Sequence, residues 1–577
     1  MAAIITTFDK TNISEFANFL LSKGITIYST GGTYNYILQN AQDKKENIKK
    51  VSDLTNHPEI LNGRVKTLHP TIYGGILAKR NPEDLLEIAG LGIAPIDIII
   101  VNLYPFDKVV ENDAEENEVL ENIDIGGHTL IRSGVKNYKN VLTITDPNDY
   151  QIIMNIWNEI DINIRKKYAA KAIEHITLYD MSICQYFNQD DVCRIYKQRK
   201  PLKYGTNPQQ YIAGLYDNIQ NSNDAKLFEI LNGNIGYINC LDAIYGWKLV
   251  SEIEETLNFP AVASYKHNSP AGVAIAGNLS DIQRKIYFVE NIDLTPTATA
   301  FIKARYSDPM CSFGDFIAVS GIVDECTAKL ISLEVSDGII AFDYEDAALE
   351  ILKKKKNGAF VILKGNKIDK KQNRLEIREI HNTTLIQNEN TAIVPKNELQ
   401  NISDDKINDL LLANITLKYT QSNSVCATLN GQTIGIGAGQ QSRVDCVKLV
   451  RKKAENWYLR HHPYCQEIIN RFKKGIKRVD KINAMLNYIE NDYIDANLFD
   501  SEISSLNFRK MYLETLDDVS LASDAFFPFR DNIDIANTFG VKYIIQPGGS
   551  INDENIISVC NGYNIRMVMT NTRMFLH

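Results

Sequence analysis

The stretch Ile96-Asp97-Ile98-Ile99-Ile100-Val101-Asn102-Leu103 is an almost unbroken run of isoleucine and valine. Such a run is typical of a strand that is buried on both faces of a parallel sheet. Residues 2–7 and 25–29 also predict strands, and residues 141–145 predict a further one. Helical patterns separate these strands, so the sequence predicts a doubly wound α/β domain. In such domains, ligands bind at the carboxyl ends of the strands.

Capping and spacing indicate two helices near the start of this domain. The first is expected because apolar residues recur at helical spacing, namely Ile13, Phe16, Leu20 and Leu21. Gly24 stands where a helix commonly ends. Thr30-Gly-Gly-Thr33 opens the second helix, where backbone N–H groups can hold a phosphate. An ordinary tight turn explains the same four residues equally well.

A chain of 577 residues exceeds what one hydrophobic core normally supports. A long helix over residues 164–187 closes the first domain, and a polar, charged segment, 188–201, follows it. We therefore expect two domains, 1–199 and 200–577.

The second domain mixes strands and helices without strict alternation. Asn430-Gly431, between residues 425–429 and 432–436, predicts a hairpin with a type I′ turn. Asn268-Ser269 and Asn423-Ser424 each lie beside an apolar strand, which suggests an internal repeat.

Composition narrows the class of protein. A formal charge of −9 and a pI near 5.6 argue against bulk nucleic-acid binding. No apolar run approaches the ~18 residues of a membrane span, and the first residues do not resemble a signal peptide. Nine cysteines without a C-x-x-C spacing do not suggest a disulfide framework, so we expect a reducing cytosol.

One segment brings two chemically active side chains together. In Pro260-Ala-Val-Ala-Ser-Tyr-Lys-His-Asn-Ser-Pro-Ala-Gly272, the apolar start predicts a short buried strand, 260–263, which delivers Lys266 and His267 before a Pro/Gly turn. Such a pair can supply a base and a partner for an oxyanion. The alternative is a basic pair on an exposed loop.

Further motifs decide between these interpretations: Ser312-Phe-Gly-Asp315, Ser336-Asp-Gly338, Gln421-Ser-Asn-Ser424, Gln440-Gln-Ser-Arg443 and Ser523-Asp-Ala-Phe-Phe-Pro-Phe-Arg-Asp531. With the Lys-His pair, they make the chain resemble the bifunctional purine-biosynthesis enzymes that join an aminoimidazole carboxamide ribonucleotide (AICAR) formyltransferase to an inosinate (IMP) cyclohydrolase. The resemblance runs from about Asp9 to the last residues. It implies an N-terminal methylglyoxal-synthase-like domain and a C-terminal α/β transferase domain of two deaminase-like subdomains.

For the N-terminal domain, the resemblance implies ring closure of formyl-AICAR to IMP. Lys136 would transfer the proton, supported by Lys66, Tyr104 and Asp124. The implied substrate-binding residues are Asp9, Lys10, Thr30, Gly31, Gly32, Thr33, Arg64, Thr67, Asn102, Ile125 and Gly126. Phe8 departs from the family, which often has a small hydroxyl residue at that position.

For the C-terminal domain, the resemblance implies transfer of a formyl group from 10-formyltetrahydrofolate to AICAR. His267 would act as the base, and Lys266 would meet the oxyanion. The implied substrate-binding residues are Lys203, Tyr204, Asn207, Gly314, Asp337, Asn423, Arg443, Phe526, Asp531 and Arg573. Asn423 and Arg443 would reach the site from the partner subunit of a homodimer. Lys203 and Gln209 depart from the Arg and His that the family often has.

The remaining expectations concern cofactors and partners. The resemblance allows a monovalent cation such as potassium, for which no residue pattern identifies a site, and small-molecule substrates without nucleic acid or membrane. His57-Pro-Glu59 spells H-x-E without the P-C-x-x-C half of a zinc deaminase, so no metal site is predicted. His461-His462 predicts a surface pair. Two alternatives stay open: a formyltransferase with a nucleotide-sensing N-terminal domain, and a non-enzymatic purine or folate binder.

Overall fold

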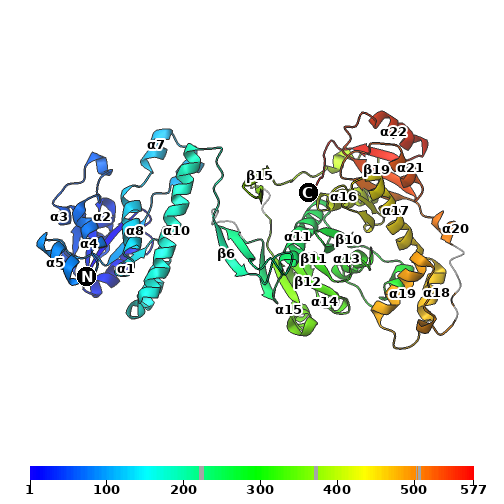
Figure 1. Cartoon of the computed structure of the whole chain (residues 1–577), viewed down its shortest axis with the longest axis horizontal. Coiled ribbons are helices and arrows are strands. Elements are labelled where there is room, and N and C mark those ends of the chain that lie inside the picture. The colour runs from blue at the N-terminus through cyan, green and yellow to red at the C-terminus, as the bar shows by residue number, and fades with distance from the viewer. Residues whose placement is uncertain (220–225, 369–373, 502, 504–508) are drawn as a thin grey trace. The chain divides into compact units, whose positions relative to one another are not determined.

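The computed structural model describes residues 1–219, 226–368, 374–501, 503 and 509–577. The chain divides into two compact units (Figure 1). Unit 1 comprises Met1–Ile195 with Asn218–Gln220, and unit 2 comprises Tyr196–Asp217 with Asn221–His577. The functional division at residues 199 and 200 stays a prediction.

Unit 1 is built on a five-stranded sheet in the order β3-β2-β1-β4-β5, with every pair of neighbours parallel. Its strands are β1 (Ala2–Thr7), β2 (Thr26–Ser29), β3 (Ile48–Lys50), β4 (Ile98–Asn102) and β5 (Leu142–Ile144). All five residues of β4 are buried, which confirms the interpretation of the isoleucine run. The doubly wound prediction is also confirmed.

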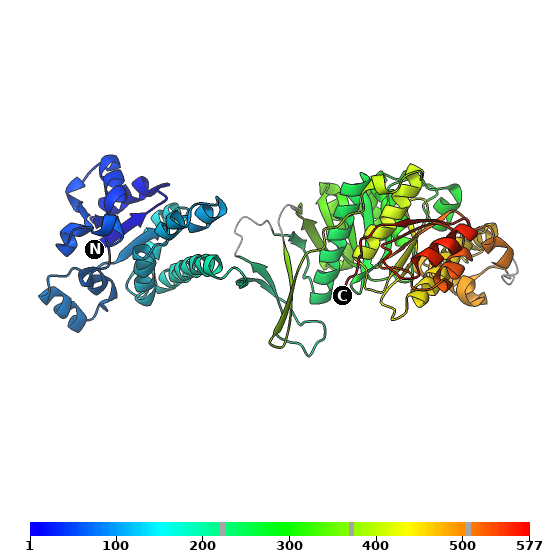
Figure 2. The ribbon, with the colours of Figure 1, turned by 90° about the horizontal axis from the view of Figure 1, so that it is seen from above.

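Helices cover this sheet. They are α1 (Ile13–Ser22), α2 (Gly31–Asn40), α3 (Val51–Thr55), α4 (Pro70–Leu77), α5 (Pro82–Gly90), α6 (Phe106–Glu111), α7 (Glu116–Glu121), α8 (Gly126–Lys136), α9 (Asp149–Asn155) and α10 (Ile162–Phe187). The four apolar residues predicted to face the core from α1 are all buried. The 26-residue α10, cyan in Figure 2, packs along α8 and β5.

The end of the polar, charged segment 188–201 is a strand. Its last residues form β6 (Tyr196–Pro201), which pairs with β7 (Gly214–Asn218) in a two-stranded sheet. Polar and charged residues can form such a ribbon because a two-stranded sheet buries little of either face.

Unit 2 contains two large sheets that share an order of five strands, and the first has β8 as a sixth. The first runs β10-β9-β11-β12-β13-β8 and the second runs β17-β16-β18-β19-β20. Their strands are β8 (Phe228–Asn232), β9 (Ala261–Lys266), β10 (Ser269–Ile275), β11 (Asp315–Val323), β12 (Ser336–Tyr344), β13 (Val361–Gly365), β16 (Val425–Thr428), β17 (Thr433–Gly437), β18 (Val519–Ser523), β19 (Val541–Gln546) and β20 (Arg566–Met569).

In each sheet, an antiparallel hairpin is followed by three mutually parallel strands, the first of which pairs antiparallel with the hairpin. The helices repeat in the same order: α11 (Tyr237–Leu257), α13 (Pro296–Arg305), α14 (Glu325–Ser332) and α15 (Asp346–Lys353) match α16 (Asp404–Lys418), α17 (Arg443–Leu459), α21 (Asp531–Asn537) and α22 (Asp553–Gly562). The expected pair of similar subdomains is therefore confirmed.

The sequence pairs that suggested this repeat are not equivalent positions. Asn268 lies in the turn between β9 and β10, whereas Asn423 precedes β16. The true counterpart of the first turn is Asn430-Gly431. Its φ angles of 55° and 70° confirm the predicted type I′ hairpin.

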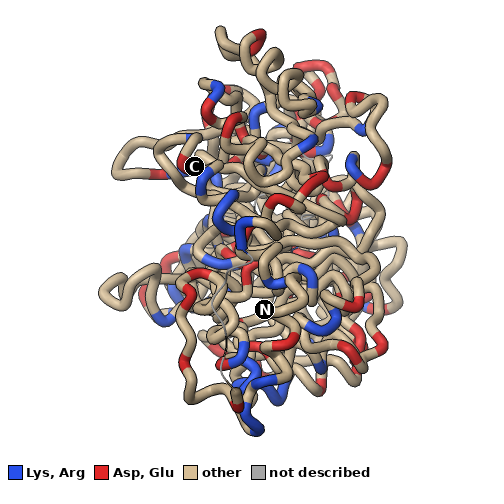
Figure 3. Tube along the Cα trace, turned by 90° about the vertical axis from the view of Figure 1, so that its right-hand side faces the viewer, with Lys and Arg blue, Asp and Glu red and all other residues tan. Residues whose placement is uncertain are grey.

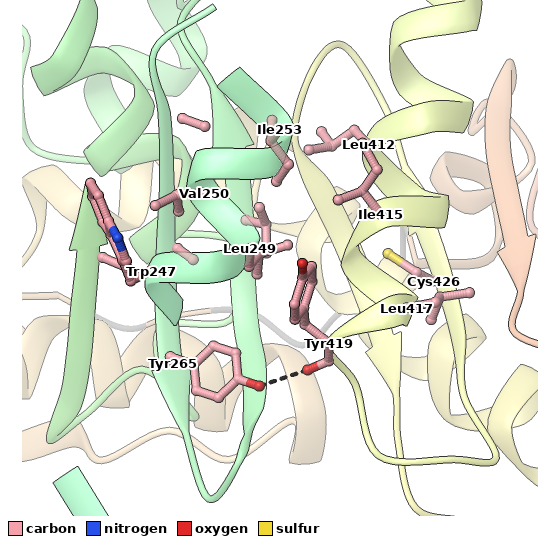
Figure 4. Packing of buried hydrophobic residues seen from close by; sticks show 14 of the residues in the cluster. Trp247, Leu249, Val250, Ile253, Tyr265, Leu412, Ile415, Leu417, Tyr419 and Cys426 are labelled. Carbon is pink, nitrogen blue, oxygen red and sulfur yellow. Dashed lines mark hydrogen bonds between the residues drawn. The ribbon is translucent and has the colours of Figure 1, made fainter. Parts of the chain in front are cut away.

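The two subdomains share a core in which α11 packs against α16 (Figure 4). Leu249, Val250 and Ile253 of α11 meet apolar side chains of α16, and each fully buried side chain of this size contributes about 1.5–3 kcal/mol. Tyr265 in β9 is fully buried, and its hydroxyl donates to the Tyr419 carbonyl at 2.7 Å. This core fixes the position of β9, and with it the turn that carries the Lys-His pair.

The other elements of unit 2 are α12 (Asp281–Ile286), α18 (Pro463–Asn470), α19 (Arg478–Asn491), α20 (Arg509–Leu513), β14 (Leu375–Ile380) and β15 (Thr383–Asn388). In the parts of the chain that the structure describes, no helix is long and apolar enough to cross a membrane. Figure 3 shows basic and acidic residues interspersed along the trace.

Candidate active sites

The first candidate site lies at the carboxyl edge of the unit 1 sheet, where β1, β2 and β4 end. Asn102, the last residue of β4, accepts hydrogen bonds from the N–H groups of Phe8 and Asp9 at 2.7 and 2.9 Å. Its amide nitrogen donates to the Asp9 carbonyl at 2.9 Å. The side chain of Asn102 is therefore used to hold the loop after β1, and it shapes the edge of the site rather than facing a ligand freely.

The loop after β1 is also braced from within. One Asp9 carboxylate oxygen accepts from the N–H and the hydroxyl of Thr11, at 2.9 and 2.6 Å, and these bonds lower the pKa of Asp9. Lys10 is partly exposed, and its ammonium donates to the Phe8 carbonyl at 3.3 Å. The Phe8 ring meets Tyr104 edge to face at 5.6 Å. Phe8 thus replaces a hydroxyl group with a contact that positions Tyr104.

The N-terminus of α2 has backbone N–H groups that can bind an anion. A carboxylate already lies beside them. Thr30 is the N-cap residue, and the Gly31 N–H donates to Glu59 at 3.2 Å. The other Glu59 oxygen lies 3.9 Å from the Lys66 ammonium. Gly32 has open space around it. Sequence reasoning considered Glu59 only as half of a zinc motif and missed its place at a helix N-terminus.

The side chain of Thr33 is engaged within the fold. It is buried, and its hydroxyl donates to the Thr7 carbonyl at 2.9 Å and accepts from the Thr7 N–H at 3.2 Å. It ties α2 to β1 and leaves no hydroxyl hydrogen for a ligand.

Lys66, Thr67 and Asp124 converge beside the start of α8. A Cβ atom on Gly126 would lie 2.7 Å from the Thr67 hydroxyl, and one on Gly127 would lie 2.7 Å from Asp124, so both glycines permit this close approach. Asp124 accepts from the Gly127 N–H at 2.7 Å. Burial raises the pKa of Asp124, while the Gly127 N–H, His128 and Lys66 oppose that rise.

Two neighbours of this cluster point outward. Arg64 forms an ion pair with Glu121 of α7, and both side chains are more than half exposed. Ile125, the N-cap residue of α8, is also exposed. In this structure, Arg64 therefore has a competing partner for its guanidinium.

Within one chain, Lys136 does not lie beside the other residues predicted for ring closure, and its role stays a prediction. It is the last residue of α8, whereas Asp124 and Gly126 stand at the first turn. Ten residues of helix separate the two ends by about 15 Å. The next residue, Asn137, donates to the carbonyls of Ile76 and Ala78 at 2.7 and 3.0 Å, near the far end of α4. Lys136 therefore lies toward the opposite edge of the sheet.

The second candidate site is the turn between β9 and β10. The predicted strand was too short and the predicted turn misplaced: β9 continues to Lys266, and Pro270 and Gly272 lie inside β10. The two turn residues are His267 and Asn268, with φ of 54° and 59°. The Lys266 ammonium donates to the Phe313 carbonyl at 2.6 Å, and His267 is exposed.

Gly314 directly precedes β11, and Asp337 is the second residue of β12. Gly314 has a φ of 74°, and its N–H donates to the Val335 carbonyl at 2.8 Å. Asp337 forms a 2.6 Å ion pair with Lys356. Sequence reasoning missed Asp242, a buried residue of α11 that accepts from the Asn268 N–H at 2.8 Å. No short motif marks it, because it lies 25 residues before His267 on another element.

Lys203, Tyr204 and Asn207 form a separate group. The Lys203 ammonium lies 5.8 Å from the centre of the Tyr204 ring, and Asn207 donates to Gln210 at 2.8 Å through its N–H. Within the described ranges, none of the hydrogen bonds or ion pairs of these three residues reaches Lys266 or His267.

The third candidate site is a cavity of about 510 Å³ in the second subdomain. Five of the residues predicted to bind substrate line it: Asn423, Arg443, Phe526, Asp531 and Arg573. The Arg573 guanidinium lies 4.6 Å from the centre of the Phe575 ring. The Gln421 N–H donates to the Ser269 hydroxyl at 3.2 Å, so the segment leading to Asn423 runs beside the His267 turn.

The predicted histidine pair is not a surface pair. His461 is buried, and burial beside Arg460 lowers its pKa to about 3. Its Nδ1 lies 2.8 Å from the Trp457 carbonyl. In the part of the chain that the structure describes, no group of three or more His, Cys, Asp or Glu residues could hold a metal ion.

Unit 1 has a parallel sheet and a helix N-terminus that can bind an anion. Unit 2 is duplicated and carries a Lys-His turn. These features define an α/β enzyme with separate reaction centres. Comparison with known proteins specifies the family. The sequence profile of the MGS-like domain matches residues 12–129, and that of the AICARFT/IMPCHase bienzyme matches residues 134–453. The chain belongs to the AICARFT/IMPCHase bienzyme family.

Relatives match over the whole length. The bifunctional purine biosynthesis protein PurH of Fusobacterium nucleatum is 35% identical, and that of Clostridium acetobutylicum is 34% identical; each match covers 100% of this chain and 99% of the relative. This chain is therefore a bifunctional enzyme of purine biosynthesis. Among solved structures, ForH is 30% identical with a TM-score of 0.29, over 32% of this chain and 98% of that one.

Proposed function

We propose that unit 1 closes the purine ring of IMP and that unit 2 formylates AICAR with 10-formyltetrahydrofolate as the donor. The observation that carries this assignment is the cavity in unit 2, because five residues selected from sequence alone line it together. Resemblance to the family supplies the chemistry, and the geometry of each cluster supports it.

Ring closure joins the carboxamide nitrogen of formyl-AICAR to its formyl carbon, and the former formyl oxygen leaves as water. The nitrogen is a weak nucleophile, so orientation and oxyanion stabilisation dominate catalysis. The start of α2 would hold the phosphate once Glu59 moves aside. Lys66 would then stabilise the oxyanion, and Asp124 would bind the amide hydrogen.

Lys136 can serve this reaction only from another copy of the chain, because α8 holds it about 15 Å from its own Asp124. A homodimer that places the end of α8 against the partner's site would satisfy both the family resemblance and the geometry. Ring closure would then also depend on association, unlike a site built within one chain.

Formyl transfer begins when the 5-amino group of AICAR attacks the formyl carbon of the folate. His267 would remove the proton from the attacking nitrogen as the C–N bond forms. Lys266 would stabilise the tetrahedral oxyanion and then help to protonate the departing folate nitrogen. In the cavity, Phe526 can stack on a flat heterocycle and Arg573 can bind an anion.

A homodimer would bring Asn423 and Arg443 to the partner's Lys-His turn. We place the enzyme in the cytosol, where all nine cysteines would remain thiols, as they are in this structure. The monovalent cation is assigned no residues, and neither reaction is derived through it.

The test supplies the purified chain with AICAR and 10-formyltetrahydrofolate and follows tetrahydrofolate and IMP separately. Both products should form. Tetrahydrofolate with formyl-AICAR but no IMP would make unit 1 a nucleotide sensor. Neither product would make the chain a binding protein.

A further inference from the structure

In both halves of unit 2, a buried aspartate from the preceding helix holds the hairpin turn. Asp242 is the sixth residue of α11, and Asp409 is the sixth residue of α16. Asp242 accepts from the Asn268 N–H at 2.8 Å, and Asp409 accepts from the N–H groups of Asn430 and Gly431 at 3.0 and 2.6 Å. Both carboxylates are buried, at 4% and 1% exposure.

The two turns differ in the residues at their turn positions. The Asn430-Gly431 turn has a glycine at its second position, and the carbonyl of Asn430 accepts from the buried Lys303 ammonium at 2.8 Å. The His267-Asn268 turn has a positive φ at two residues that are not glycine. Such positions are strained and persist only where the surroundings hold them. In the first half, Asp242 therefore holds a strained turn that carries the imidazole of His267.

We infer that Asp242 is the positioning residue of the formyl-transfer site, fixing the backbone of the His267 turn and setting a negative charge beside the imidazole. This inference rests on the proposed role of His267. Burial raises the pKa of Asp242, whereas the turn N–H groups and the charge of His267 lower it. The other groups that face this carboxylate are Asp337 and the Tyr265 hydroxyl, and Lys266, the last residue of β9, directly precedes His267.

The experiment compares Asp242→Asn with the matched Asp409→Asn in the full-length protein. Each change keeps an oxygen acceptor for its turn and removes one buried negative charge. Asp242→Asn should lower the kcat of formyl transfer by up to about 10²-fold, the cost of a small misplacement, with the KM for AICAR changed little. Asp409→Asn should keep the kcat of formyl transfer.

Two outcomes overturn the inference. One is a wild-type kcat in Asp242→Asn, and the other is an equal loss of kcat in both variants, which means general damage to the fold. If Asp242→Asn does not fold, Asp242→Glu keeps the charge but shifts its position, and should lower kcat with the KM for AICAR changed little; a wild-type kcat there also overturns the inference. His267→Ala is measured in parallel: if it retains wild-type transfer, the proposed function fails instead.

Discussion

The side chains of Arg443 and Asn423 are joined directly, with Nη2 of the arginine donating to Oδ1 of the asparagine at 2.7 Å. The same guanidinium donates to the Ser523 hydroxyl at 2.9 Å and pairs with the fully buried Asp524. Arg443 itself is buried, with an exposure of 8%. It therefore organises the wall of the unit 2 cavity and keeps few donors for a ligand.

Replacing Arg443 by lysine should disrupt this wall although the charge is kept, because an ammonium cannot span Asn423 and Asp524 as a planar fork does. Breaking a buried pair costs about 3–5 kcal/mol, so thermal unfolding of unit 2 should shift downward and formyl transfer should fall. Arg530→Lys, at an exposed pair with Asp534, is the control and should change neither. A wild-type melting profile in Arg443→Lys would contradict this account.

Subunit exchange tests the shared transferase site. Mixed His267→Ala and Arg443→Ala chains should regain part of the transferase activity that each homodimer lacks. One site of the heterodimer then receives both defects and the other receives neither. Demonstrated heterodimers without any recovery would show that each chain builds its own site.

The position of Lys136 gives a parallel prediction for ring closure. Lys136→Ala and Asp124→Asn should each slow IMP formation from formyl-AICAR, and mixing them should restore part of the rate. Arg132→Ala, one turn earlier on α8, is the control. If Lys136→Ala closes the ring at the wild-type rate, Lys136 has no part in the reaction.

Glu59 should weaken nucleotide binding in unit 1, because its carboxylate faces the same N–H and ammonium groups that a phosphate would use. Glu59→Gln should lower the KM for ring closure by up to about fivefold, since one electrostatic contact near a helix start is worth about 1 kcal/mol. Glu83→Gln, which changes the first turn of α5 instead, should leave the KM unchanged. A raised KM in Glu59→Gln would mean that Glu59 assists binding.

Asp124 makes ring closure and stability compete. Its pKa is raised by burial, so the folded state binds this proton more tightly than the unfolded state does. Its contribution to stability is full below the unfolded value of about 3.9 and is lost as pH rises through the folded value. Asp124→Asn keeps the bond from Gly127 and should therefore gain in melting temperature relative to wild type as pH rises to neutrality. No pH dependence in that difference would refute this explanation.

Local pattern predicted the elements of unit 1 well. The isoleucine run, the apolar spacing of α1 and the glycine after it each report burial or backbone geometry within a few residues. The hairpin at Asn430-Gly431 was predictable for the same reason. The His267 turn was misplaced because its two left-handed residues are not glycines, and a carboxylate from a distant helix holds them.

The sequence by itself determined which side chains are available: Lys66, Asp124, Lys266 and His267, and the motifs that place the chain in its family. The tertiary structure alone decided which of them meet. Helix α8 separates Lys136 from Asp124, and Glu59 turns toward the start of α2. The equivalence of Asp242 and Asp409 is visible only when the two subdomains are compared. These relations join residues far apart in sequence, so they follow from packing and strand order, which no local pattern encodes.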